Sequence, residues 1–231
     1  MSPRSVLPVL PLCALLLQAC AHAPARPEKA LTPGGPDIVQ AGAPVLRARA
    51  GEVPPEHIQS PEFRALVDRM VAAMRAAPGV GLAAPQLGVG LRVLVLEDTA
   101  ERMAALGEAE KAERGRVPVP LRVLVNPVLR PVGERTASFF EGCLSVRGYA
   151  AVVTRAHEVE VTGLDETGAP VRWQVSGWPA RILQHEVDHL DGTLYVDRMH
   201  TRTLSTPEQV KARFSGRPVE DVLRELGVKA P

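Results

Sequence analysis

The stretch Gln184-His185-Glu186-Val187-Asp188-His189-Leu190-Asp191-Gly192 places two histidines four residues apart. Residues at this spacing lie on one face of an α-helix, so His185 and His189 can offer imidazole nitrogens to one metal ion. Glu186 follows at the edge of that face, close enough to exchange protons with a water held at the ion. Three apolar side chains share the roughly opposite face: Leu183, Val187 and Leu190. The pattern predicts a helix from Trp178 to Leu190, which ends near the glycine that closes the stretch.

A match to His-Glu-x-x-His also arises by chance in many proteins, so the stretch alone leaves a metal site and an ordinary buried helix as alternatives. A third ligand elsewhere in the chain favours the metal site, and Cys143 is the candidate. Three protein ligands leave one tetrahedral position for solvent, which is the pattern of catalytic rather than structural metal sites. The remaining histidines have no partner at ligand spacing, and we expect surface or hydrogen-bonded roles for them: His22, His57, His157 and His200.

The N-terminus has the pattern of a secretory signal peptide. Arg4 gives a positive start, and the apolar run over residues 6–17 is too short to span a membrane. Leu17-Gln18-Ala19-Cys20 resembles the lipobox of bacterial lipoproteins, in which the cysteine is lipidated and becomes the first residue of the mature chain. We therefore expect a signal peptide over residues 1–19, a lipid anchor at Cys20 and a location in the cell envelope. The alternative is an uncleaved apolar N-terminus on a cytoplasmic protein.

The cysteine count agrees with a metal ligand at Cys143. Cys13 would leave with the signal peptide and Cys20 would carry lipid, so Cys143 would have no disulfide partner in the chain. Metal ligation accounts for a single cysteine in an exported protein. Residues 20–36, rich in alanine and proline, predict a flexible tether.

Size and composition narrow the class of protein. A chain of 231 residues suits one domain with extensions, and we expect the catalytic domain over residues 37–206 and a helical extension over 207–231. The net charge of +1 and the aromatic content of 3% exclude a nucleic-acid surface built on basic patches or base stacking. The sequence leaves the oligomeric state open.

The chain outside the histidine stretch predicts an α+β fold. Ser60-Pro61-Glu62 is a helix start, and apolar residues recur at helical spacing from there to about Ala77. Apolar β-branched runs predict strands over residues 91–97, 121–125, 151–153, 157–164 and 171–175. We expect Asn126-Pro127 to end the second of these strands, the turn at Asp165–Gly168 to join the last two as a hairpin, and short turns of this kind to make the sheets antiparallel.

Further segments complete the predicted architecture. Residues 37–46 are expected to be extended, the charged residues 99–118 to form a solvated loop or short surface helix, and residues 206–208 and 218–226 to begin or form terminal helices. The predicted fold is therefore antiparallel β-sheets packed around a central metal-binding helix, with an N-terminal helix and a C-terminal helical tail.

The segment Gly79-Val80-Gly81-Leu82-Ala83-Ala84-Pro85-Gln86 is dense in small residues, which let a backbone approach a neighbour or ligand closely. Its glycines precede a strand and so do not fit a dinucleotide-binding pattern. Local sequence favours a buried amide satisfied by backbone at Gln86, and a donor aimed into a cleft is the alternative.

Together with this segment, two further motifs resemble those of the peptide deformylase family, in the family's order: Glu141-Gly142-Cys143-Leu144-Ser145 and the histidine stretch. The run Ser176-Gly177-Trp178-Pro179-Ala180-Arg181-Ile182-Leu183 resembles the organellar-type subgroup. The resemblance implies hydrolysis of the N-formyl group of formyl-methionyl peptides, with release of formate. It also implies Fe²⁺ at Cys143, His185 and His189, in a site that Zn²⁺, Ni²⁺ or Co²⁺ can also occupy.

The resemblance assigns further roles at matching positions. It implies a metal-bound water as nucleophile, Glu186 as general acid/base, and the Gln86 side chain and the Leu144 N–H as oxyanion donors. The backbone of Gly81 would pair with the peptide, and the methionine pocket would have these walls: Val80, Trp178, Leu144 and His185. Glu141 and Ser145 would orient the ligand-bearing backbone, and Asp188 a histidine or an arginine.

Two other functions remain as alternatives. A zinc endopeptidase shares the His-Glu-x-x-His helix, but no third histidine or glutamate follows at the usual spacing. A binding module in the cell envelope would keep the fold without turnover, although the recognisable catalytic positions are intact.

Overall fold

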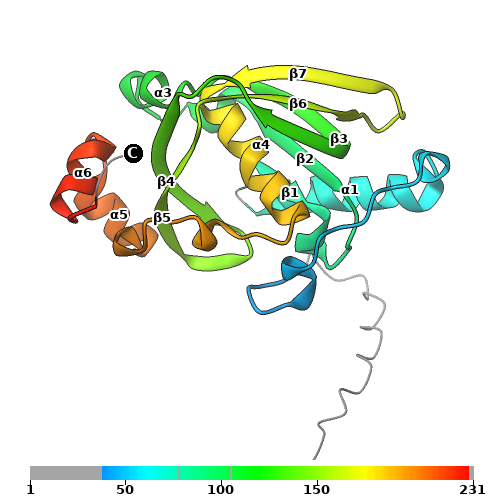
Figure 1. Cartoon of the computed structure of the whole chain (residues 1–231), viewed down its shortest axis with the longest axis horizontal. Helices are drawn as coiled ribbons and strands as arrows, with labels where there is room; N and C mark the ends of the chain where they lie inside the picture. Colours follow the sequence, from blue (N-terminus) through cyan, green and yellow to red (C-terminus); the bar gives the residue numbers. More distant parts are fainter. Residues whose placement is uncertain (1–37, 78, 105, 229–231) are drawn as a thin grey trace, which may run out of the picture. The chain divides into compact units, whose positions relative to one another are not determined.

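The computed structural model describes residues 38–77, 79–104 and 106–228 (Figure 1). The predicted signal peptide, Cys20 and the tether lie outside these residues. None of the helices in the described ranges combines the length and the apolar character that a membrane crossing needs.

Two antiparallel sheets form the β-structure. The larger has five strands in the order β1-β2-β3-β6-β7: Gly81–Ala83, Val93–Asp98, Val119–Pro131, Glu158–Leu164 and Pro170–Ser176. The smaller pairs β4 (Thr136–Cys143) with β5 (Val146–Ala156). The hairpin predicted at Asp165–Gly168 joins β6 to β7 and is confirmed.

The helix α4 (Gly177–Leu190) lies between the two sheets (Figure 1). Its Leu183 and Leu190 are fully buried among residues of β2, β3 and β6. The predicted α+β fold around a central helix is therefore confirmed.

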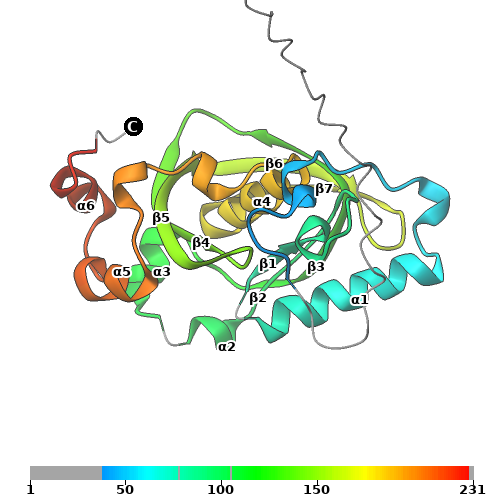
Figure 2. The ribbon, with the colours of Figure 1, turned by 90° about the horizontal axis from the view of Figure 1, so that it is seen from below.

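A second helix, α1 (Pro61–Ala76), covers the other face of the larger sheet (Figure 2). The Ser60 side chain caps it by accepting a hydrogen bond from the Phe63 N–H at 3.1 Å, as the sequence predicts. The apolar side chains of β2 pack on both faces of the larger sheet, because successive side chains along a strand point to opposite faces. Val93 and Val95 join the cluster with α1, while Leu94 and Leu96 join the cluster with α4.

The predicted end of the strand at Asn126-Pro127 is wrong, because β3 continues to Pro131. The strand passes these residues through a bulge between Val125 and Val128, where Asn126 adopts a left-handed φ of 50°. The Asn126 side chain binds both backbone groups of Val53, accepting from its N–H at 2.8 Å and donating to its carbonyl at 2.9 Å. A turn residue therefore bends the strand here instead of ending it.

The remaining segments complete the fold. The charged segment contains the short helices α2 (Ala100–Met103) and α3 (Glu108–Arg114), and the residues predicted as extended contain a 3₁₀ turn at Pro44–Arg47. Both terminal helices are confirmed as α5 (Pro207–Phe214) and α6 (Val219–Glu225). Three further 3₁₀ turns lie near the site or after α4, and a fourth precedes α1: Ala84–Leu87, Tyr195–Asp197, Thr201–Thr203 and Pro55–His57.

Candidate metal centre

The three candidate ligands lie together. Cys143 ends β4, and His185 and His189 lie one turn apart on α4. One ligand atom from each lies within 4.8 Å of the others, and the Cys143 sulfur is 3.3 Å from the His189 Nε2. In the described part of the chain no other histidine joins such a group; His200, for example, shares a hydrogen bond of 2.9 Å with Thr154.

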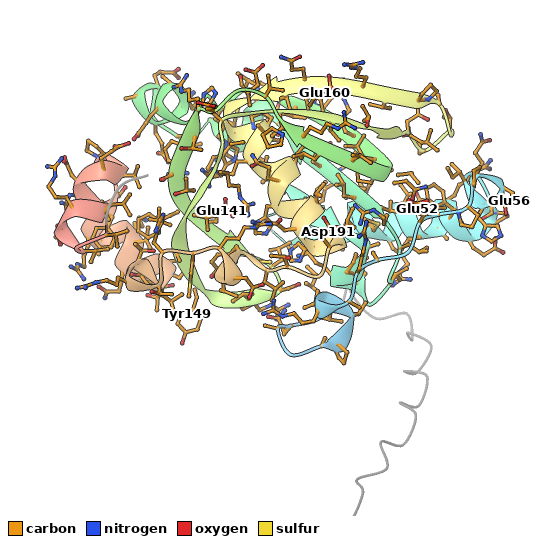
Figure 3. All side chains as sticks on the ribbon, viewed as in Figure 1. Glu52, Glu56, Glu141, Tyr149, Glu160 and Asp191 are labelled. Carbon is orange, nitrogen blue, oxygen red and sulfur yellow. The ribbon has the colours of Figure 1, made fainter. Side chains whose placement is uncertain are left out.

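The His185 ring is oriented by Glu141, which Figure 3 labels between β4 and α4. The His185 Nδ1 lies 3.0 Å from the Glu141 carboxylate. A neutral imidazole donates its proton there and leaves Nε2 free to ligate, as metal-binding histidines commonly do. Burial opposes ionisation of Glu141, but hydrogen bonds from His185 and Arg155 hold its pKa well below the ordinary value. Glu141 is therefore a carboxylate that fixes one ligand.

Two buried arginines hold Glu141 in turn. Arg155 donates to both carboxylate oxygens at 2.6 and 2.9 Å, and Arg181 donates to one of them. Arg155 also donates to Asp188 at 2.8 Å, and Asp188 accepts two hydrogen bonds from Arg198. Of the two roles expected for Asp188, the structure places it against arginines. A buried network in which every charge is paired fixes the position of β4 relative to α4 at the candidate ligands.

Glu186 is buried beside the ligands, with 4% of its surface exposed. Burial raises the pKa of its carboxyl to about 7, and one carboxyl oxygen has no hydrogen-bond partner among the described residues. A carboxyl group that titrates near neutrality can both take and return a proton. The side chain lies against Gly81, where an added Cβ would overlap the Glu186 carboxylate. The structure thus gives a reason for glycine at position 81 other than the expected pairing with a peptide.

Both interpretations of Gln86 hold at once. Its side-chain oxygen accepts a hydrogen bond from the Ala83 N–H at 2.8 Å, so the backbone does satisfy it. This bond aims the amide nitrogen at the centre, 3.7 Å from the Cys143 sulfur and 3.4 Å from the Ser145 hydroxyl. The amide nitrogen is therefore a fixed donor at the centre.

An N-terminal segment, which the sequence predicts only as extended, binds backbone carbonyls at and beside the two residues that are predicted to supply oxyanion donors. The Gln40 side chain donates to the Leu144 carbonyl at 3.0 Å, and the Ala41 N–H donates to the Ser145 carbonyl at 2.8 Å. The Val39 N–H donates to the Gln86 carbonyl at 2.9 Å. No local pattern announces these contacts, since Gln40 and Leu144 are 104 residues apart. Arg155 was missed as well, although an arginine within an apolar strand is a signal for a buried ion pair.

A cavity of about 550 Å³ opens beside the centre. The site residues expected from the sequence line it, apart from His189: Val80, Gly81, Gln86, Cys143, Leu144, Trp178, His185 and Glu186. Tyr149, which is half exposed and labelled in Figure 3, and Pro207 of the C-terminal extension add to its wall. The centre therefore opens into a cavity large enough for a small substrate.

Comparison with known proteins gives one family. The model of the family described as polypeptide deformylase matches residues 36–204. Peptide deformylase 3 of Streptomyces avermitilis is 50% identical over 208 residues, which cover 89% of this chain and 90% of that protein. The chloroplastic peptide deformylase 1A of Solanum lycopersicum is 53% identical over 175 residues, and the chain spans 76% of its own length and 63% of that relative's.

A solved structure agrees with the sequence relatives. The Met-Ala-Ser-bound class I type b peptide deformylase from Acinetobacter baumannii has a TM-score of 0.64 and 32% identity, covering 72% of this chain and 99% of that chain. The shared fold, the residues matched by the family model and the Cys-His-His group all point to the same family. The chain therefore belongs to the polypeptide deformylase family, metal-dependent hydrolases that remove the N-formyl group of formyl-methionyl peptides and release formate.

Proposed function

We propose that Cys143, His185 and His189 hold Fe²⁺ and that the cleft beside them deformylates N-formylmethionyl peptides. The observation that carries the proposal is the convergence of one thiol and two imidazoles beside a buried carboxyl group with a pKa of about 7. Thiolate and imidazole donors suit Fe²⁺, Zn²⁺, Ni²⁺ and Co²⁺ alike, so the donor set fits each of these ions. A divalent cation held there supplies Lewis acidity, which polarises a carbonyl and lowers the pKa of water toward neutrality.

Glu186 handles the proton in this proposal. With a pKa of about 7, its carboxylate takes the proton of the attacking water and then passes it to the leaving amine of the peptide. The absence of a hydrogen-bond partner on one carboxyl oxygen leaves that oxygen available for the transfer.

Two donors stabilise the oxyanion that forms when water adds to the formyl carbon. The Gln86 amide nitrogen is held by the Ala83 contact, and the Leu144 N–H belongs to the loop that Gln40 binds. Losing one such donor typically costs about 3 kcal/mol of transition-state stabilisation. The Gln86 amide is therefore fixed by a hydrogen bond of its own, and the loop that carries the Leu144 N–H is fixed through its neighbouring carbonyl.

The substrate peptide binds along the edge of the larger sheet. In the described ranges, β1 is the first strand in the sheet order and pairs with β2 alone, so the backbone edge at Gly81 can accept an extended peptide as an added strand. The methionine side chain then enters the cavity between Val80 and Trp178. Apolar walls at this place favour an apolar side chain.

The cellular location is a separate part of the proposal. We propose that residues 1–19 are removed, that Cys20 carries lipid, and that residues 20–36 tether the catalytic domain to the cell envelope. The support is the sequence pattern alone. Palmitate labelling that depends on Cys20, combined with fractionation, tests it; unlabelled protein in the cytoplasmic fraction would support the uncleaved alternative.

The test of the activity uses protein purified without oxygen and loaded with Fe²⁺. It should release formate from formyl-Met-Ala-Ser, and Glu186→Ala should abolish release while retaining bound metal. Glu166→Ala, at an exposed turn, is the control and should leave the rate unchanged. Robust turnover by Glu186→Ala overturns the role of the base. Cleavage of an internal peptide bond without formate supports the endopeptidase, and peptide binding without product supports the binding module.

A further inference from the structure

The charged segment that the sequence predicts to be solvated contributes to the substrate cavity indirectly. At the end of α3, the Arg114 guanidinium carbon lies over the Trp178 ring, 5.0 Å from its centroid, and the Arg116 guanidinium carbon lies 5.4 Å from it. Trp178 itself lines the cavity beside the metal centre. The two arginines therefore contact the wall of the cavity without lining the metal centre.

Arg116 is fixed to the core of the protein. Its guanidinium donates two hydrogen bonds to the Asp98 carboxylate, at 2.8 and 3.1 Å. Asp98 ends β2 and is 1% exposed, so the ion pair is anchored at a buried point of the larger sheet. A bidentate pair of this kind sets both the position and the plane of the guanidinium. The Arg116 cation that contacts Trp178 is therefore held in position by β2.

The backbone of the same turn contacts the start of α4. The Trp178 N–H donates to the Gly115 carbonyl at 3.4 Å. A Cβ added at Gly177 would lie 3.0 Å from the Arg114 carbonyl oxygen and 3.0 Å from the Gly115 Cα. Gly177 also has a φ of +68°, which disfavours other residues. The turn at residues 114–116 therefore packs directly against the first turn of α4.

We propose that Arg116 is a positioning residue that holds the Trp178 indole as a wall of the methionine pocket and so contributes to selectivity for methionine. The inference rests on the proposed function, in which Trp178 contacts the substrate side chain. Without Arg116 the indole keeps only the Arg114 cation, so it can rotate more freely about its side-chain bonds, and the pocket then has a less defined wall. Small side chains lose little from this change, because they never reach the wall, whereas methionine loses its contact.

The test is the double variant Asp98→Asn/Arg116→Gln, which removes the Arg116 cation, keeps Arg114 over the ring, and does not leave Asp98 as a buried, unpaired charge. Arg116→Lys is the second variant, because lysine keeps the charge but cannot make the bidentate pair. The control is Arg122→Gln, since Arg122 lies over Trp173 of β7 at 5.7 Å, and Trp173 does not line the cavity. All proteins carry the metal and are compared by thermal melting.

The main measurement is kcat and KM with formyl-Met-Ala-Ser and formyl-Ala-Ala-Ser. Loss of one cation–π contact predicts a rise of about fivefold in KM for the methionine peptide with kcat nearly unchanged, and a smaller rise for Arg116→Lys. KM for the alanine peptide should stay as in the wild type, so the preference for methionine should fall by about fivefold. The Arg122 control should retain the wild-type preference.

Two further readouts do not depend on turnover. In a Trp173→Phe background the emission of Trp178 should change with the double variant, and the affinity for Met-Ala-Ser should fall by about fivefold. Unchanged preference, affinity and emission overturn the inference. An equal loss of kcat/KM for both peptides also overturns it, because that result indicates a general structural role. If the wild type releases no formate, the proposed function fails, and peptide affinity and emission still decide the role of Arg116.

Discussion

Gly81→Ala should separate the placement of Glu186 from substrate binding. A Cβ at position 81 would lie 2.8 Å from the Glu186 Cδ and 2.9 Å from its Cγ. Ordinary carbon contacts are about 3.5–4.0 Å, so the carboxylate must move by roughly 1 Å. A displacement of this size in a catalytic group costs about 10²-fold in rate, which is about 2.7 kcal/mol in the barrier. We therefore expect kcat for formyl-Met-Ala-Ser to fall by about 100-fold with KM within threefold of the wild type.

The fold should survive this change. Gly81 has no left-handed φ, and overpacking at one site costs about 1–3 kcal/mol. That cost corresponds to a fall of several degrees in the melting temperature for a domain of this size. Bound metal should stay at the wild-type ratio, since no ligand is touched. Gly90→Ala is the matched control, because its added Cβ meets nothing within 4 Å.

The opposite kinetic pattern would refute the reasoning. If glycine is needed at position 81 only so that a peptide can approach the backbone, KM should rise while kcat stays the same. A Gly81→Ala enzyme with wild-type kcat and raised KM would therefore show that the contact with Glu186 does not set the rate.

Substitutions at three other positions test the scaffold of the fold. Gln40→Ala removes the bond to the Leu144 carbonyl and should lower kcat by about tenfold with little change in KM, measured by steady-state kinetics. Asn126→Ala loses two hydrogen bonds to Val53 and leaves alanine in a left-handed conformation, so unfolding free energy in urea should fall by about 3 kcal/mol. Asn126→Gly avoids the backbone strain and should lose only about 2 kcal/mol; an equal loss in both variants would contradict the strain argument. Ser60→Ala removes the cap of α1 and should lower stability by about 1 kcal/mol, or about 2–4 °C in melting temperature, without affecting activity.

Local sequence patterns were enough to predict a feature where all the interactions that determine it lie within one short segment. Ser60 caps the helix that begins at Pro61, and the four-residue spacing of His185 and His189 puts both rings on one face, whatever lies around them. The run Val93–Leu96 is apolar on both faces of its strand, so it must be covered on both sides. The sequence thus predicts the central helix, most strands and the ligand set without knowledge of their partners.

The tertiary structure decided what depends on residues distant in the chain. The local pattern Asn126-Pro127 is compatible both with the end of a strand and with a bulge inside one. Only the contact with Val53 distinguishes the two. Gln40 reaches Leu144 and Arg116 reaches Trp178 through folding alone, and nothing near these residues in the sequence shows those neighbours.

The physical reason is that secondary structure and ligand spacing follow from interactions over a few residues, which the order of amino acids states directly. The orientation of a ligand, the pKa of Glu186 and the wall of a pocket follow from burial and from charges brought together by packing. The amino-acid order by itself therefore predicts which side chains would bind the metal and move the proton. Only the packed structure decided how each is held.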